Sequence, residues 1–267
     1  MALATPDMFF PVKDDNPTQL RPVVTIGLIA VNTLVYVLNN LRLDEIGVGL
    51  FSFAYGIIPY EVTHLEEVST AVALRALKGW GGAGVEFGGA DELSFPIMAT
   101  PFTSMFMHGG FMHLFGNMLY LWIYGNNIED YFGHLRFLLF YLVGGLAAVA
   151  LHITVSPNSL VPLVGASGAI SAVLGAYIVL YPRARVLVVY FLFFMLQSAW
   201  LPAYVVLGFY FVIQIFNALL GLGASGDGGV AWMAHLGGFG FGWVLLRLIS
   251  RRRNRWRDQS DGTVVAQ

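Results

Sequence analysis

The sequence predicts an all-α polytopic membrane protein, and its composition is the first observation that predicts it. Of its 267 residues, 57% are hydrophobic and only 11% are charged, whereas soluble domains carry about 25% charged residues. The second observation is a mean hydropathy of +0.69. The third is a series of apolar stretches long enough to cross a hydrocarbon core of roughly 30 Å. With so few charges, the net charge of -2 gives no sign of a nucleic-acid partner, and we expect none.

The N-terminal part predicts a short cytoplasmic segment followed by the first span. Residues 1–22 are polar and contain prolines, without the apolar stretch of a cleaved signal peptide. The run from Val23 to Leu41 carries no charge and is long enough to span the bilayer. Cysteine is absent from the chain, which excludes disulfides, thiol catalysis and thiolate metal sites.

Residues 42–100 predict a long outer loop with short interfacial helices rather than a separate domain. Acidic residues dominate this region, which also holds a glycine-rich piece from Gly79 to Gly89.

Five further apolar segments complete a predicted bundle of six transmembrane helices within residues 23–249. They are Met107 to Tyr124, Leu135 to Ile153, Val164 to Tyr181, Leu201 to Leu220 and Val230 to Ile249. The segment 186–200 is also apolar but abuts the fifth span across Pro202. It predicts either an interfacial hairpin or part of a seventh crossing, and we favour the hairpin.

The distribution of positive charge predicts the orientation. On the six-span topology, 11 of the 14 Lys and Arg residues lie on the side of the termini. By the positive-inside rule, both termini are cytoplasmic, residues 250–267 form a basic cytoplasmic tail, and loop 42–100 is outside. We expect a multi-pass protein of a bacterial-type cell membrane. No repeat supports an inverted-repeat transporter.

A serine between glycines stands where the fourth span begins. Residues 162–169 are Pro-Leu-Val-Gly-Ala-Ser-Gly-Ala. Ser167 would therefore lie among free backbone N–H groups at the positive end of a helix dipole, which suits a nucleophile whose reaction generates an oxyanion. The alternative is that these small residues only let membrane helices approach closely.

Polar residues in two other spans predict a shared site with this serine. His113 and Asn117 have the i, i+4 spacing that places both on one helix face. His235 shares a face with Gly238 and Gly242 in the sixth span. On the six-span topology His113, Ser167 and His235 each lie roughly 7 to 9 Å below the outer start of their helix. Their similar depth favours one site over unrelated packing roles.

The residue types at this depth predict a Ser-His dyad. No Asp or Glu lies within a predicted span, and Asp227, Glu129 and Asp130 lie in loops, so neither a Ser-His-Asp triad nor an aspartyl protease is expected. No His-Glu-x-x-His motif for a zinc protease occurs. A three-histidine metal site would leave the serine-glycine turn unexplained, so we expect no metal and no cofactor.

From the first span to the sixth, the chain resembles the rhomboid intramembrane serine proteases. Gly56 to Pro59 in the outer loop and Gly133 to Leu142 before the third span share in this resemblance. The resemblance implies a six-helix rhomboid-like bundle. The family's three motifs correspond to Gly165, Ser167 and Gly168, to His108, His113 and Asn117, and to Ala234, His235, Gly238 and Gly242.

The resemblance also implies roles and partners. Ser167 would attack the scissile carbonyl and His235 would act as the base. His113, Asn117 and the Ser167 backbone N–H would hold the oxyanion, and His108 would shape the water-accessible outer end. The substrates would be transmembrane segments of membrane proteins, cleaved near the outer face of the lipid bilayer. The sequence carries no signal for the oligomeric state.

Two departures from the family pattern concern the membrane seating of the outer loop and the surroundings of His235. The outer loop lacks a clear Trp-Arg pair, and Ser171 stands where many relatives carry an aromatic residue one turn after the serine. An aromatic residue from another helix, with Trp232 the nearest candidate in sequence, or water would fill the space beside Ser171. We expect water, because Trp232 stacks along its own helix more readily than it reaches across.

Two alternative functions stay open at this point. One is a catalytically inactive rhomboid-like protein that binds membrane clients, although Ser167 and His235 are both retained. The other is a transporter or channel whose histidines line a polar path, which would more naturally carry intramembrane charges.

Overall fold

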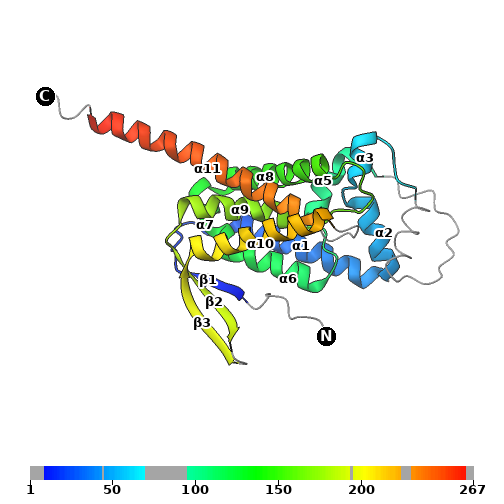
Figure 1. Cartoon of the computed structure of the whole chain (residues 1–267), viewed down its shortest axis with the longest axis horizontal. Helices are drawn as coiled ribbons and strands as arrows, with labels where there is room; N and C mark the ends of the chain where they lie inside the picture. The colour runs from blue at the N-terminus through cyan, green and yellow to red at the C-terminus, as the bar shows by residue number, and fades with distance from the viewer. Residues whose placement is uncertain (1–8, 44, 70–94, 193–194, 224–229, 263–267) are drawn as a thin grey trace.

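A computed structural model of the chain forms a helical bundle with a small sheet at one end (Figure 1). It describes residues 9–43, 45–69, 95–192, 195–223 and 230–262. The glycine-rich piece of the predicted outer loop and Asp227 lie outside the described residues. The elements are β1 (Phe9–Asp14), α1 (Val23–Arg42), α2 (Glu45–Tyr55), α3 (Pro59–His64), η1 (Ile97–Ala99), α5 (Thr100–Thr103), η2 (Ser104–Phe106), α6 (Phe111–Tyr120), the π-helical turn η3 (Leu121–Gly125), α7 (Asn126–Phe132), α8 (His134–Val155), α9 (Ser167–Leu180), β2 (Arg185–Leu192), β3 (Met195–Pro202), α10 (Ala203–Gly223) and α11 (Val230–Gly262).

Three helices of the described chain are long and apolar enough to cross a membrane: Val23–Arg42, His134–Val155 and the Trp232–Ser250 part of α11. Two shorter apolar helices, Ser167–Leu180 and Ala203–Asn217, accompany them. The protein is therefore a helical membrane protein, and the count of six crossings stays a prediction. Beyond residue 250, in the predicted basic tail, α11 continues as a helix to Gly262. This C-terminal part of α11 projects past the other helices in Figure 1.

The predicted second span is built from two consecutive helical pieces. It begins at Phe111 of α6 rather than at Met107 and continues through the π-helical turn η3 to Gly125. After the span, α7 extends the helix to Phe132. Gly133 adopts a positive φ of 75°, a conformation that glycine reaches without steric cost. The chain therefore turns sharply at Gly133, between α7 and α8.

α9 lies in the centre of the bundle and packs against α8 and α11 through small residues. Ser171, Ala172, Val173 and Gly175 are among its buried residues. A Cβ at Gly238 would overlap the carbonyl oxygen of Gly168, and one at Gly242 would overlap that of Ala172. These glycines let the backbones of α9 and α11 touch, which is the packing role that small residues have in membrane helices.

The segment 186–200 forms a hairpin, as predicted, but one of two β-strands. β2 pairs antiparallel with β3, with Arg185 opposite Pro202 and Leu192 opposite Met195. β1 joins the other edge of β2, so the prediction of an all-α protein is wrong here. β1 contains Pro11, which a strand tolerates at a sheet edge, and its partner is about 175 residues away, so no local pattern predicts the pairing.

A cluster of polar side chains lies at the end of the bundle where α9 finishes. The buried Glu129 carboxylate accepts hydrogen bonds from the backbone N–H groups of Val24 and Thr25, both at 2.8 Å, and from the Thr25 hydroxyl at 2.7 Å. His134 Nδ1 is 2.6 Å from the same carboxylate. Glu129 therefore caps the start of α1.

Asp14 ties β1 to this end of the bundle. Its carboxylate accepts hydrogen bonds from the Tyr177 hydroxyl at 2.5 Å and from Asn127 Nδ2 at 2.8 Å. Burial raises the pKa of Asp14 above its ordinary value, although these two hydrogen bonds act in the opposite direction. The N-terminal strand is thus held by the far end of the helix that begins with Ser167.

Candidate active site

Ser167 is the first residue of α9, and two connections hold the segment that precedes it. Leu163 forms an antiparallel bridge with Ile57, with N–H to O distances of 2.8 and 3.1 Å. The Gly165 N–H donates to the Ser104 carbonyl at 2.8 Å. Because Ile57 lies in the Gly56 to Pro59 stretch of the predicted outer loop, that segment contributes directly to the position of Ser167.

Gly165 occupies a position that only glycine fits. Its φ of 128° is one that L side chains rarely adopt. A Cβ there would also lie 2.9 Å from the His113 ring. Gly165 therefore lets the turn before Ser167 pass directly beside His113.

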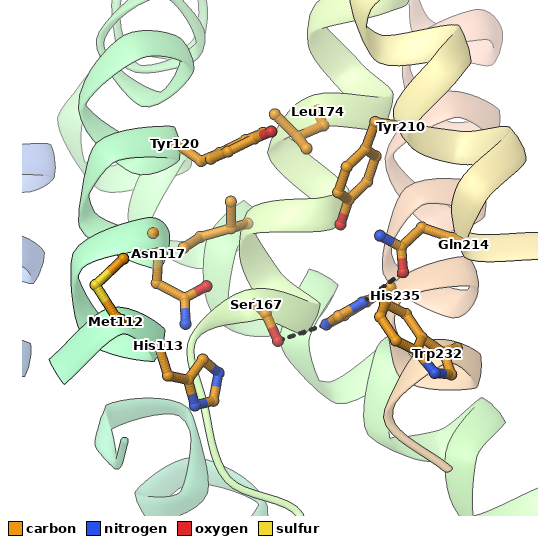
Figure 2. Close-up of a pocket in the computed structure, with 12 residues that line it drawn as sticks. Met112, His113, Asn117, Tyr120, Ser167, Leu174, Tyr210, Gln214, Trp232 and His235 are labelled. Atoms are coloured by element: carbon orange, nitrogen blue, oxygen red, sulfur yellow. Dashed lines mark hydrogen bonds between the residues drawn. The ribbon is translucent and has the colours of Figure 1, made fainter. Parts of the chain in front are cut away.

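Ser167 and His235 form a hydrogen-bonded pair. Ser167 Oγ is 2.7 Å from His235 Nε2 (Figure 2). The two side chains come from α9 and α11, whose backbones touch at the glycines described above. A nucleophile and a base at hydrogen-bond distance can perform acyl transfer.

Gln214 of α10 completes a chain of three polar side chains. Its Oε1 is 2.8 Å from His235 Nδ1, and the side chain is only 5% exposed. The sequence reasoning missed Gln214 because it considered histidines and acids as partners for Ser167. The signal was available, since a lone glutamine in an apolar helix is costly without a partner.

The space beside Ser171 is filled by Tyr210, so the expectation of water is wrong. Ser171 is fully buried, and its Oγ is 3.1 Å from the Tyr210 hydroxyl. As expected, Trp232 packs along its own helix: its ring lies edge-on to the His235 ring, with the two ring centroids 5.8 Å apart. The aromatic residue comes from α10, whose position beside α9 no pattern in the sequence indicates.

His113 and Asn117 lie on the opposite side of Ser167 from His235 and Gln214 (Figure 2). All five line one cavity of about 590 Å³. The structure thus brings together the three residues whose predicted depths agree. The remaining walls of the cavity are mainly apolar and include Met112, Ile170, Leu174 and Trp232.

Asn117 offers a donor to this cavity. Its side chain is buried at 7% exposure, and Nδ2 has no hydrogen-bond partner among the described residues. A buried amide without a partner is costly. A donor of this kind, beside a serine nucleophile, suits an oxyanion that appears only during reaction.

His108 lies outside the cavity lining and is only 6% exposed. The segment before α6 is packed into the bundle, where Ser104 and Met105 are also buried. The His108 ring packs edge-on against the His113 ring at a centroid distance of 5.1 Å. Its contact with the site is therefore through His113, and its role in shaping the outer end stays a prediction.

Comparisons with known proteins agree with these features. The model of a family described as "Rhomboid domain" matches residues 98–252. The chain is 30% identical over 164 residues to the mitochondrial Rhomboid protein 1 of Saccharomyces cerevisiae, covering 57% of this chain and 43% of that protein. It is 42% identical over 74 residues to Rhomboid protease GluP of Bacillus subtilis, covering 28% of this chain and 14% of that protein. With RHOMBOID-like protein 4 of Arabidopsis thaliana it shares 33% identity over 162 residues, 58% of this chain and 35% of that protein. The matched region is less than half of each relative.

Proposed function

The chain belongs to the rhomboid family, and from this premise we propose that it is an intramembrane serine endopeptidase that cleaves transmembrane segments of membrane proteins. The observation that carries the proposal is the 2.7 Å contact between Ser167 Oγ and His235 Nε2 on the wall of a cavity. A catalytically inactive relative would have no need to keep this pair in contact, and family membership leaves the transporter alternative without support.

The reaction begins when the Nε2 lone pair of His235 takes the Ser167 proton as Oγ attacks the scissile carbonyl carbon. The tetrahedral intermediate collapses when His235 gives that proton to the leaving amine, and the C–N bond breaks. A water molecule then attacks the ester carbonyl and transfers a proton to His235. Release of the carboxylic acid returns that proton to Ser167.

The carbonyl oxygen becomes negative in both tetrahedral intermediates. We assign its stabilisation to Asn117, His113 and the Ser167 backbone N–H at the start of α9. Support comes from the unpartnered Nδ2 of Asn117 and from the position of His113 beside the turn that precedes Ser167. In comparable sites a single donor lowers the barrier by about 3 kcal/mol.

The proposal includes six crossings with both termini in the cytoplasm. The three crossings beyond those recognised by length would be α6 with η3, then α9, and then α10. Eleven of the 14 Lys and Arg residues then face the cytoplasm, and Ser167 lies near the outer face. Relatives are named from mitochondria and from a bacterium, so the proposal covers an integral membrane setting and assigns no particular membrane.

The experiment is cleavage of a model transmembrane substrate by the purified protein in liposomes. We expect cleavage near the outer end of the substrate helix by the natural protein and none by Ser167→Ala. Equal product from both proteins, or none from a folded natural protein with several substrates of different sequence, would contradict the proposal.

A further inference from the structure

Gln214 is the polar residue of the site that the dyad mechanism leaves unassigned. It is almost completely buried, on a helix whose other described residues are largely apolar, and its Oε1 faces His235 Nδ1 at 2.8 Å. Because a side-chain amide oxygen can only accept, Nδ1 must carry the proton in this contact. The lone pair of the imidazole is then on Nε2, which faces Ser167 Oγ.

We infer that Gln214 is a positioning residue that fixes the productive tautomer and ring orientation of His235; this rests on the proposed function. In serine hydrolases a buried acid has this task, and no acid contacts His235 within the described residues. Gln214 occupies the position of that acid relative to His235 Nδ1, but its side chain carries no charge.

Two variants separate this role from simple packing. Gln214→Met keeps the size and removes the acceptor, so kcat should fall about 10- to 100-fold with little change in KM or Tm. Gln214→Glu offers an acceptor that stabilises the protonated imidazole, so activity should persist and the acid limb of its pH–rate profile should move to higher pH. Gln197→Met, the same change on β3, serves as the control.

The outcomes are distinguishable from failure of the protease proposal. If the natural protein is active and the Gln214→Met variant is equally active, the inference about Gln214 is overturned and the protease proposal is not. A loss of Tm in both Gln214 variants, with unmoved pH profiles, would assign Gln214 to packing and overturn it too. If the natural protein is inactive, nitrogen NMR of labelled histidine still decides, because the Nδ1–H tautomer of His235 should be lost in Gln214→Met.

The three-stranded sheet carries an independent inference, because both of its faces are mainly apolar. Val186 and Val188 point into the bundle and are fully buried. The alternate residues, on the outward face, are Phe10, Lys13, Leu187, Val189, Phe191, Leu196, Ser198 and Trp200. In water an antiparallel sheet normally presents polar residues on its outward face. An apolar outward face indicates an apolar neighbour.

The order of side chains along this outward face indicates which neighbour. The tip carries Phe191 and Leu196, which are 50% and 63% exposed. At the base, Lys13 Nζ lies 5.5 Å from the centre of the Trp200 ring. Tryptophan and lysine next to an apolar surface are typical of the headgroup level of a bilayer. β3 also leads directly into α10, whose exposed Tyr204 and Phe209 extend the apolar surface.

We propose that the sheet lies on the lipid leaflet at the end of the bundle opposite Ser167, with its tip in the upper acyl region and its base among phosphate headgroups. α9 has 14 residues, so its end near the sheet is about 21 Å from its start at Ser167. In Figure 1 the hairpin leaves the bundle sideways at this end. Its open strand edges limit its depth, because unpaired backbone groups are costly in hydrocarbon.

Because the chain has no cysteine, single thiols can test this position directly. Leu196→Cys and the exposed Asn158→Cys, which lies near the other end of the bundle, would each carry an environment-sensitive fluorophore. In phosphatidylcholine nanodiscs, Leu196→Cys should emit at shorter wavelength and be quenched by brominated acyl chains, and Asn158→Cys should do neither. Water-like emission at position 196 would contradict the proposal. Shielding that appears in detergent and rises with protein concentration would instead assign the face to a second copy.

Discussion

In the proposed topology α9 has an outer end at Ser167 and an inner end at Leu180. These two ends contain buried polar clusters of opposite character. At the inner end the Glu129 carboxylate accepts from two backbone N–H groups and the Thr25 hydroxyl, with His134 as a fourth contact. At the outer end the polar chain of Ser167, His235 and Gln214 contains no carboxylate, and Asn117 Nδ2 has no partner among the described residues.

The difference separates structure from function. A buried charge whose hydrogen bonds are all made stabilises the fold. Removal of that charge leaves several buried donors without acceptors. An unpaired buried donor beside a nucleophile costs stability, but it is available for a charge that forms during reaction. Mutations at the outer end should therefore change rates, and mutations at the inner end should change stability.

The largest effect is expected from the reacting pair. Ser167→Ala and His235→Ala should each lower kcat by about four orders of magnitude or more, with Tm nearly unchanged. The double variant should be no worse than either single one, because both residues serve one covalent step. Initial rates on a transmembrane substrate, with thermal melts, measure this; losses that multiply in the double variant would show that the residues act separately.

Asn117→Ala should come next, with a fall in kcat of about 100- to 1000-fold and little change in KM. Removal of the amide should leave Tm intact, because Nδ2 has no partner to lose. The exposed Asn158→Ala is the matched control. A rise in KM alone would assign Asn117 to substrate binding and remove the oxyanion role.

At the inner end, Glu129→Ala should destabilise the protein by about 3 kcal/mol, because it leaves the Val24 and Thr25 donors buried and unpaired. The remaining folded protein should keep its kcat. Chemical denaturation in mild detergent measures the first expectation, and activity per folded molecule measures the second. Loss of catalysis without loss of stability would reverse the assignment of the two ends.

The same carboxylate predicts how stability depends on pH. Burial alone would raise the pKa of Glu129, but hydrogen bonds from Thr25, Val24 and His134 lower it below the ordinary value of 4.5. Its contribution should therefore be complete above pH 4.5 and be lost as the pH falls towards the lower pKa of the folded state. Tm measured against pH should show this decline, and Glu129→Gln should flatten it. An equal decline in both proteins would assign it to other groups.

The smallest effect is expected from Tyr210→Phe, which removes one hydroxyl but keeps the ring beside Ser171. The loss should be about 1 kcal/mol in stability, with rates within a few-fold of the natural protein.

Ser171→Tyr, by contrast, has no space for its larger side chain, because Ser171 is fully buried. A fully active and stable Ser171→Tyr protein would show that this packing is not fixed.

Sequence reasoning reached the site wherever a local pattern sufficed. The glycines around Ser167 and the spacing of His235, Gly238 and Gly242 indicate a helix start and a close helix contact. The lone Gln214 in the otherwise largely apolar α10 was a usable signal that the reasoning did not apply. Tyr210 escaped it, because the apolar pattern of α10 does not indicate which face meets α9. The pairing of β1 with β2 is equally inaccessible, since it joins segments about 175 residues apart.

The most direct test of the Ser167 and His235 assignment is labelling by a fluorophosphonate, followed by intact mass and peptide mapping. A folded natural protein should gain one adduct, on Ser167, while Ser167→Ala and His235→Ala should gain none at the same time and concentration. An unlabelled natural protein, or an adduct that persists in Ser167→Ala, would contradict a catalytic serine activated by His235.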